Sequence, residues 1–388
     1  MLPRITTVYK YGFCATLGFL IIMIYMSQSR HSRTAKRPFD RLGREMEIPV
    51  KSNRHYLQVE QKRSAEFQAF KTKTNENKII KSEFPISSTQ KIISPHNFDY
   101  IINEEKLCDN ETFLLIYVHT APGHVRHRNV IRDTWGNANN IKDISIKLIF
   151  LLGNASTRKL NDAIKFESEH YHDIIQEDFV DSYRNLTYKG IMGLKWVTNY
   201  CKTAKFILKT DDDIFVNIFI LIKHLKARLE HDIGTSNLIL CHIWFRMHVV
   251  RDKRSKWYIS EAEYEPNVFP PYCSGAAFVL SADAPKAMYK RSLYEPFFWV
   301  DDYFISGLLA TKAGLVREKF NRQYSISPMQ FIEKFLHPIS LEQQLIFGQA
   351  VNINQILRVW KKVLEFMKTL NKNTEHSRGK LIDDNRTI

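Results

Sequence analysis

The chain has 388 residues, of which 44% are hydrophobic and 25% are charged, so it can build a substantial core and is not a disordered protein. Its formal net charge is +15, but residues 1–81 alone carry 16 Lys and Arg against 6 Asp and Glu. The other 307 residues therefore carry only +5. Because the basic excess lies mainly in the N-terminal arm, the charge does not indicate a nucleic acid partner for the folded part.

An uncharged segment of sixteen residues, Tyr11–Met26, lies between basic residues near the N-terminus. It is shorter than the ~20 residues of a typical membrane-spanning helix, but long enough for a thin bilayer. A cleaved signal peptide is the alternative. We favour an uncleaved anchor, because no small-x-small cleavage motif follows the segment. This predicts a cytoplasmic tail at residues 1–10, a transmembrane helix at 11–26 and a polar stem at 27–105.

Sequons for N-glycosylation support this orientation. They occur at Asn110, Asn154, Asn185 and Asn385. Such sites are usable only if the part of the chain after the anchor faces a lumen. We therefore expect a single-pass type II membrane protein with a lumenal domain.

The cysteines agree with an oxidising compartment. Four of them fall in the folded region: Cys108, Cys201, Cys241 and Cys273. An even number permits two disulfides, in any of three pairings. No Cys-x-x-Cys or Cys/His spacing typical of zinc sites occurs.

From residue 106 to about 350 the sequence alternates short apolar runs with helix-like stretches. In chain order it predicts strands at Phe113–Val118 and Lys147–Leu152, from Ile174, and at Phe206–Leu208, with helices at His127–Trp135, from the cap Ser156 to His170, and at Arg184–Tyr200. Strands separated by helices predict an α/β fold with a mostly parallel central sheet and helices on both faces. Ligands in such sheets bind at the carboxyl ends of the strands.

Three adjacent acids, Asp211, Asp212 and Asp213, follow the fourth predicted strand and interrupt an apolar segment. Adjacent carboxylates repel one another, so a fold that holds them together needs a cation or hydrogen-bond donors. Oxygen ligands suit Mg²⁺ and Mn²⁺, which share phosphate oxygens with bound nucleotides. A solvated turn is the alternative. A calcium loop of the EF-hand type is excluded, because Val216 and Ile222 stand where that loop needs Gly and Glu.

Other polar groups are predicted at the same end of the sheet. Arg128 and Arg132 follow the first strand and offer guanidinium groups to phosphate oxygens, although an amphipathic helix with solvated arginines explains them equally well. Asp181 follows the third strand and is explained alternatively by a turn. Gly275 precedes an apolar strand and either permits close approach of a ligand or shapes the turn.

The ordered set of motifs R-N-V-I-R-D-T-W, F-L-L-G, E-D-F-V-D-S-Y-R-N-L-T-Y-K, K-T-D-D-D-I-F-V-N, P-P-Y-C-S-G and V-D-D-Y-F-I-S-G resembles the beta-1,3-galactosyltransferase family, which includes beta-1,3-N-acetylglucosaminyltransferases. The resemblance spans Thr112 to Gln344. It implies a GT-A type nucleotide-sugar-binding domain, a Golgi membrane location and dependence on Mn²⁺ or Mg²⁺. It places Asp213 and Asp211 at the metal, and assigns to the donor the residues Arg128, Arg132, Asp181, Lys209, Asp211, Asp212 and Gly275.

The chemistry of glycosyl transfer also needs a base that takes the proton from the acceptor hydroxyl. We expect Asp302 to be this base, paired with Asp301, because the apolar neighbours in W-V-D-D-Y-F partly desolvate a carboxylate. The family usually has Glu-Asp at this pair, so the shorter Asp301 alters how the acceptor is positioned. An N-terminal helix cap is the alternative reading of the two acids.

The C-terminal part adds one more candidate ligand. His337 resembles a family histidine that completes the metal shell, whereas a lone His in an apolar stretch is often structural. Residues 351–388 are predicted to be a C-terminal helix and tail, with an amphipathic helix at Gln355–Leu370.

Two classes of function follow from the sequence. The first is metal-dependent, inverting transfer of a hexose, galactose first, from UDP-galactose to a glycan on protein or lipid in beta-1,3 linkage, with UDP-N-acetylglucosamine as the alternative donor. The second is a non-catalytic, membrane-tethered chaperone or glycan-binding relative. The presence of both the acid triplet and the Asp301-Asp302 pair favours the enzyme. A nucleotidyl- or phosphotransferase is disfavoured, because the chain lacks a G-x-x-x-x-G-K-S/T loop.

Overall fold

The computed structural model describes residues 90–336 and 345–384. The predicted anchor, most of the predicted stem, His337 and Asn385 lie outside the described residues. Within the described ranges, no helix has the length and apolar character needed to cross a membrane.

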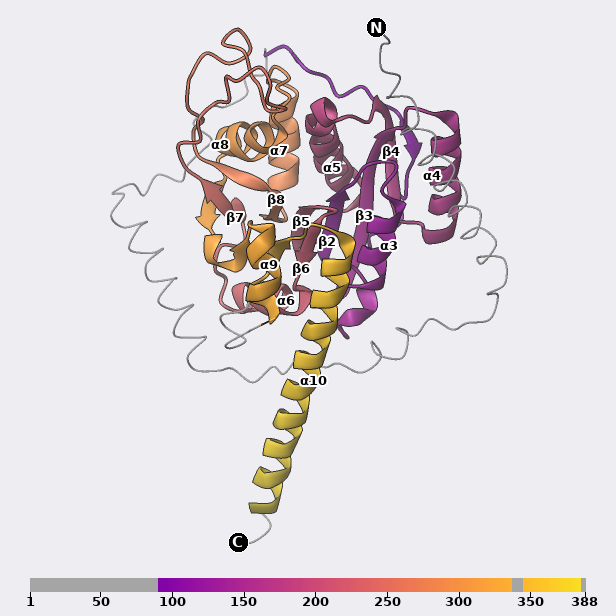
Figure 1. Ribbon diagram of the computed structural model, residues 1–388, viewed down its shortest axis with the longest axis vertical. Helices are drawn as coiled ribbons and strands as arrows, with labels where there is room; N and C mark the ends of the chain where they lie inside the picture. The colour runs from indigo at the N-terminus through magenta and orange to yellow at the C-terminus, as the bar shows by residue number, and fades with distance from the viewer. Residues whose placement is uncertain (1–89, 337–344, 385–388) are drawn as a thin grey trace, which may run out of the picture. The chain divides into compact units, whose positions relative to one another are not determined.

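A mixed eight-stranded sheet forms the centre of the domain (Figure 1). Its strands are β1 (Tyr100–Ile102), β2 (Thr112–His119), β3 (Ser145–Asn154), β4 (Ile174–Val180), β5 (Phe206–Asp211), β7 (Leu238–Trp244), β8 (Tyr272–Ser281) and β9 (Val316–Lys319). The order is β1-β4-β3-β2-β5-β8-β7-β9. The predicted parallel arrangement is confirmed for β4-β3-β2-β5. The rest of the sheet is mixed: β8 runs antiparallel to both β5 and β7, β9 is parallel to β7, and the edge strand β1 is antiparallel to β4.

A second, three-stranded sheet was not predicted. It joins β10 (Tyr324–Ser325), β11 (Phe347–Gln349) and β6 (Ile214–Val216), in that order. β6 follows the acid triplet directly, and β11 pairs with it antiparallel. The backbone N–H of Ala350 also donates to the carbonyl of Asp213 at 2.9 Å. The C-terminal segment therefore holds the turn that carries the acids.

The principal helices are α3 (Val125–Asp133), α4 (Arg158–Tyr171), α5 (Leu186–Tyr200), α6 (Ile218–Glu230), α7 (Ala284–Ser292), α9 (Pro328–Leu336) and α10 (Ile353–Asp384). Short helical segments are η1 (Ala138–Asn140), η2 (Tyr183–Asn185), the π-helix η3 (Asp302–Leu309), α8 (Ala310–Lys312) and η4 (Asn321–Gln323). The predicted helices match α3, α4 and α5 to within a few residues. The cap of α4 is Thr157 rather than Ser156, because the Thr157 hydroxyl accepts the N–H of Leu160.

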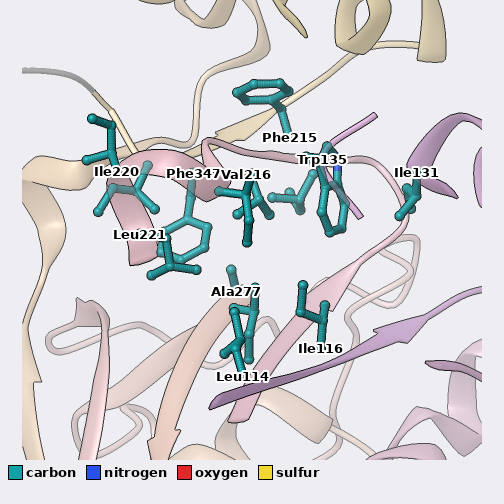
Figure 2. Packing of buried hydrophobic residues seen from close by; sticks show 14 of the residues in the cluster. Leu114, Ile116, Ile131, Trp135, Phe215, Val216, Ile220, Leu221, Ala277 and Phe347 are labelled. Atoms are coloured by element: carbon teal, nitrogen blue, oxygen red, sulfur yellow. The ribbon is translucent and has the colours of Figure 1, made fainter. Parts of the chain in front are cut away.

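Side chains of β2 alternate between two apolar layers, as expected for a strand buried on both faces. Leu114 and Ile116 face the layer that contains α6 and the small sheet, where Phe347 and Val216 pack (Figure 2). Leu115 and Tyr117 face the opposite layer, formed with α5, α7 and η3. Helices therefore cover both faces of the sheet, as predicted. Because apolar side chains pack against β2 on both faces, its position is fixed, and so is that of the residues at its carboxyl end.

Two disulfides close the domain, and the structure resolves their pairing. Cys108 bonds to Cys201, joining the segment before β2 to the end of α5. Cys241 bonds to Cys273 across the neighbouring strands β7 and β8. The prediction of two disulfides is confirmed.

The segment before β2 packs on the domain although it lies within the predicted stem. β1 pairs with β4, and His96 is buried. The imidazole Nε2 of His96 lies 2.5 Å from Oε2 of Glu177, whose other oxygen accepts Lys195 Nζ at 2.8 Å.

Candidate active site

The acid triplet lies where the parallel strands β2 and β5 end side by side, with His119 of β2 opposite Asp211 of β5. This is the edge at which ligands bind in sheets of this kind. The three carboxylates do not share one environment. Each one contacts a different part of the chain, so the triplet connects several elements at this edge.

Asp212 holds the loop that follows β2. Its Oδ2 accepts the hydroxyl of Thr120 at 2.6 Å and lies 2.8 Å from Nδ1 of His124. Burial raises the pKa of Asp212, but the hydrogen bonds from His124 and Thr120 outweigh it and leave this pKa below its usual value. In return, the hydrogen bond to Asp212 raises the pKa of His124. These contacts give Asp212 a structural role in this loop, and its predicted contact with the donor stays a prediction.

Asp211 pairs with the buried ammonium of Lys209. Their Nζ and Oδ1 atoms lie 2.6 Å apart, and Lys209 Nζ also donates to the carbonyl of Gly275. Burial raises the pKa of Asp211 to about 8, against the opposing charge of Lys209. Burial lowers the pKa of Lys209, but the charges of nearby carboxylates, Asp211 first, outweigh it and raise this pKa. Lys209 therefore connects the first acid of the triplet to Gly275, which lies inside strand β8 and not in a turn, so shaping a turn does not account for this glycine.

The Asp301-Asp302 pair stands at the start of η3, on the other side of Gly275. Oδ2 of Asp302 accepts the backbone N–H of Gly275 at 2.9 Å. Burial, reinforced by the charge of Asp302, raises the pKa of Asp301 to about 7. Burial also raises the pKa of Asp302, although Lys209 opposes the effect. Asp301 occupies the cap position of η3 but makes no side-chain capping hydrogen bond, so capping does not account for it.

Gly275 explains how Asp302 reaches this position. A Cβ atom built on Gly275 lies 1.7 Å from Oδ1 of Asp302, far inside contact distance. Only glycine leaves room for the carboxylate here. The group that approaches Gly275 is thus a side chain of the protein itself.

Two acids of the triplet offer oxygen ligands to a divalent cation. Asp213 and Asp211 supply oxygen atoms suited to Mn²⁺ or Mg²⁺. Burial raises the pKa of Asp213. A hydrogen bond of 3.4 Å from Gln349 acts in the opposite direction but does not outweigh burial. Since burial disfavours the charged form of both carboxylates, a cation here offsets that cost, and the residues fit. Residues 90–336 and 345–384 contain no cluster of three or more His, Cys, Asp or Glu arranged to hold a metal.

The two predicted donor arginines already have carboxylate partners. Arg128 is buried and donates from Nε and Nη2 to Glu167 at 2.8 and 2.6 Å. Arg132 donates to both oxygens of Asp173 at 2.7 Å and to Glu167 at 2.7 Å. These bonds connect α3 to α4 through Glu167 and to the start of β4 through Asp173, and give both arginines a structural role. Their direct contact with a donor stays a prediction.

Asp181 forms an ion pair with Lys189, a residue that was not predicted to belong to the site. Its Oδ2 accepts the backbone N–H of Gly153 at 2.7 Å and Lys189 Nζ at 2.8 Å. Lys189 is buried and also donates to the carbonyl of Thr120 at 2.6 Å. The available signal was a lysine three residues after Leu186, in line with the apolar face of the predicted helix.

The described sequons differ in their surroundings. Asn110 is exposed. The side-chain amide of Asn185 donates to the carbonyl of Val180 at 2.8 Å, and the amide oxygen of Asn154 accepts from Asn161 at 2.7 Å. Of the three, Asn110 presents its amide most freely. Glycosylation of any of them stays a prediction.

Comparison with solved structures gives only distant similarity. A galactosyltransferase LgtC in complex with donor and acceptor sugar analogs has a TM-score of 0.36 and 11% identity, covering 64% of this chain and 95% of the other. A TarS structure in complex with UDP has a TM-score of 0.32 and 10% identity, covering 65% and 64% of the two chains.

Comparison with protein sequences is more informative. A family model described as Galactosyltransferase matches residues 126–321, which include the described residues predicted to hold the metal or the donor and the Asp301-Asp302 pair. The mouse (Mus musculus) beta-1,3-galactosyltransferase 1 is 40% identical over 229 residues, covering 58% of this chain and 68% of the relative. The human (Homo sapiens) lactosylceramide 1,3-N-acetyl-beta-D-glucosaminyltransferase is 37% identical over 227 residues, covering 56% and 59%. The chain therefore belongs to the galactosyltransferase family and is a hexosyltransferase.

Proposed function

We propose that the protein transfers galactose from UDP-galactose to a hydroxyl of a glycan in beta-1,3 linkage, with inversion at the anomeric carbon. One observation supports the proposal: Lys209 bonds to Asp211, the first acid of the triplet, and to the carbonyl of Gly275 in strand β8, and the N–H of the same glycine bonds to Asp302 at the start of η3. This connection supports a donor site and an acceptor base that lie close together.

The donor half uses the end of β5. Asp211 and Asp213 would hold Mn²⁺ or Mg²⁺, and Asp212 keeps the loop Thr120–His124 in position beside them. A bound divalent ion stabilises the negative charge that develops on the departing diphosphate. Lys209 and Lys189 add buried positive charge on the same side of the sheet.

The acceptor half uses Asp302. Its raised pKa makes the carboxylate a better proton acceptor near neutral pH than an exposed aspartate. The N–H of Gly275 orients the carboxylate, and the start of η3 fixes its backbone. Asp302 would take the proton of the attacking hydroxyl while the bond to the diphosphate breaks on the opposite face of the sugar. Asp301 lies next to Asp302, and the charge of each carboxylate affects how readily the other one ionises.

N-Acetylglucosamine is the second candidate for the transferred sugar, because one of the relatives above is named for its transfer. A screen decides between the donors. Purified residues 82–388 are assayed with UDP-galactose, UDP-N-acetylglucosamine and UDP-glucose, with a panel of glycan acceptors, with and without Mn²⁺. We expect metal-dependent transfer from UDP-galactose. Transfer from none of the three donors would favour the non-catalytic, glycan-binding alternative.

The role of Asp302 is tested by Asp302→Asn, which keeps the shape of the side chain but removes its basicity. We expect kcat to fall by about 10²–10⁴-fold, the usual contribution of a positioned base. UDP binding, followed by calorimetry, should be unchanged. Asp162→Asn, the same change at an exposed position of α4, is the matched control. Undiminished turnover in Asp302→Asn would remove Asp302 from the mechanism.

We further propose that the protein acts on glycoproteins or glycolipids in the Golgi lumen, held to the membrane by its N-terminal segment. The two disulfides support an oxidising compartment. Expression in cells with Asn110→Gln tests the orientation. We expect the wild-type chain to lose mass on treatment with an N-glycosidase, and Asn110→Gln to lose less. No mass change for the wild type would contradict a lumenal domain.

A further inference from the structure

The segment between β7 and β8, residues 245–271, has an apolar core of its own, and we call it the β7-β8 loop. This core includes residues on both sides of the acid pair. Its members are Val249, Ile259, Phe269, Tyr272, Trp299 and Tyr303. The rings of Phe269 and Tyr303 have centroids 4.7 Å apart, and Tyr303 directly follows Asp302. The loop therefore packs on the start of η3, where the proposed base lies.

Bonds within the β7-β8 loop fix its conformation. The guanidinium of Arg251 donates to the carbonyl of Ile259 at 2.9 Å and to that of Tyr264 at 2.7 Å. The disulfide between Cys241 and Cys273 closes the loop at its base. A surface that is already ordered loses little conformational entropy when a ligand binds, so this loop is suited to recognition.

Two half-exposed aromatic rings lie together at this loop. Trp257 belongs to the loop and is 53% exposed, whereas Tyr183 belongs to η2 and is 47% exposed. Lys256 connects them, because its Nζ lies 4.6 Å from the centroid of the Trp257 ring and 5.4 Å from that of Tyr183. Two segments that are distant in the sequence therefore present aromatic rings at one place on the surface.

Contacts with Trp299 connect this place to the acid pair. Tyr183 and Trp299 have ring centroids 6.4 Å apart, and Trp299 precedes Asp301 by two residues. The guanidinium of Arg184 lies over Trp299, 3.8 Å from the ring centroid, and forms an ion pair of 3.6 Å with Glu263 of the β7-β8 loop. Arg184 therefore holds η2, the loop and Trp299 together.

The electrostatics agree with this placement. Burial raises the pKa of Tyr183, and a hydrogen bond with Trp257 opposes the rise. The charges of Asp301 and Asp302 reinforce the rise. Because the effect of a charge decays with distance, the Tyr183 side chain lies close to the acid pair. The two exposed rings therefore border the proposed base.

The chemistry of exposed aromatic rings suits a sugar. A pyranose ring gathers several C–H bonds on one face, and these bonds carry partial positive charge. The face of an aromatic ring is negative, so the two rings stack while the sugar keeps its hydroxyl groups in water. Exposed apolar groups rimmed by polar residues mark binding sites on soluble domains. Here the rim includes the charged side chains of Lys256 and Arg184.

We propose that Trp257 and Tyr183 form an acceptor platform, an aromatic surface on which a pyranose ring of the acceptor glycan stacks beside Asp302. Because the protein is a hexosyltransferase and its proposed acceptor is a glycan, the group that must enter next to Asp302 is a sugar ring. The platform rests on the function proposed above, since it holds the substrate of the same reaction. Trp257 and Tyr183 set the affinity for the acceptor, whereas Asp302 takes its proton.

The first test separates acceptor binding from chemistry. The acceptors are methyl β-N-acetylglucosaminide and methyl β-galactoside, with a saturating concentration of the donor that the screen above identifies. Trp257→Ala should raise the KM for the acceptor about tenfold, the equivalent of one lost stacking contact, while kcat and the KM for the donor stay within about twofold. Trp257→Phe keeps an aromatic ring and should stay within about threefold of wild type. Phe166→Ala, which removes an exposed ring on α4, is the matched control and should change neither constant.

The second test needs no turnover. Saturation-transfer NMR measures the binding of both methyl glycosides to the full-length chain in the presence of UDP and Mn²⁺. We expect Trp257→Ala and Tyr183→Ala each to weaken this binding several-fold, and Phe166→Ala to leave it unchanged. Binding of the wild type and of Trp257→Ala to vesicles of phosphatidylcholine should be equal.

Four results would change this interpretation. An acceptor KM in Trp257→Ala equal to that of wild type would overturn the platform, whether or not Asp302 is the base. Equal losses in Trp257→Ala and Trp257→Phe would assign Trp257 to the folding of the loop and would also overturn it. Weaker vesicle binding in Trp257→Ala with an unchanged acceptor KM would make this surface a membrane contact instead. If the glycosides bind through Trp257 but no sugar is transferred, the proposed function fails, and the surface stands as a glycan-binding site.

Discussion

Gly275 offers the sharpest test of the proposed site, because one added methyl group collides with the proposed base. The Cβ of Gly275→Ala would lie 1.7 Å from Oδ1, 2.5 Å from Cγ and 2.9 Å from Oδ2 of Asp302. Non-bonded heavy atoms rest about 3.5 Å apart, so the carboxylate must withdraw by about 1.5–2 Å. That movement also breaks the 2.9 Å hydrogen bond from the Gly275 N–H.

A displacement of about 1 Å in a reacting group can cost about 100-fold in rate, so we expect Gly275→Ala to lower kcat by at least that factor. The acid triplet is not displaced, so the affinity for UDP with Mn²⁺ should change little. Initial rates with UDP-galactose and calorimetric titration with UDP measure the two effects separately. Gly123→Ala is the matched control, because a Cβ there meets no atom within 4 Å. If Gly275→Ala keeps kcat near the wild-type value, Asp302 is not the base in this geometry.

Two further predictions concern charge. Because the pKa of Asp301 is raised to about 7 and that of Asp302 is raised with it, kcat/KM should fall about tenfold per pH unit on the acid side of this range, as a pH profile of initial rates will show. Both groups bind protons more tightly in the folded state, so the pair should also make the free energy of unfolding decrease, not increase, as pH rises from the usual carboxyl value of 3.8 to about 7. If kcat/KM does not fall as the pH drops below about 7, the raised pKa values of Asp301 and Asp302 would be contradicted. Arg128→Leu removes a partner of the buried Glu167 and should cost about 3 kcal/mol of unfolding free energy in urea titrations. Arg158→Leu, at an exposed ion pair of 4.0 Å, should change it by less than about 1 kcal/mol, and similar losses in the two variants would refute the structural role of Arg128.

The strands and helices of the parallel half were predictable because their signals are local. β2 and β3 are apolar runs, and α4 and α5 show regular apolar spacing with recognisable ends. The small sheet was not predictable in this way. β6 and β11 are three residues long and more than a hundred residues apart, so neither stands out from a turn until its partner is known.

The site shows the same division between local and distant information. The sequence predicts that the three adjacent acids form a site. It does not predict that each acid has a different environment in the fold. Asp212 is held by Thr120 and His124, which precede it by 92 and 88 residues, so nothing in its neighbourhood distinguishes it from Asp211. The same holds for Gly275, whose closest contact is Asp302, 27 residues away. Motif spacing indicates which residues take part, whereas pairing across the fold decides what each one does.

Lys209 shows how the two halves of the proposed reaction depend on one another. It lies on β5, two residues before the first acid of the triplet, and its strand pairs antiparallel with β8, which carries Gly275. Its ammonium bonds to Asp211 on the donor side and to the carbonyl of Gly275, whose own N–H orients Asp302 on the acceptor side. A buried ammonium that loses one of these acceptors leaves a charge with too few partners, so the remaining contacts must rearrange. Asp211 on the proposed donor side and Asp302 on the proposed acceptor side are therefore linked by one continuous set of hydrogen bonds through Lys209 and Gly275, so removing the Lys209 ammonium is expected to disturb both sides.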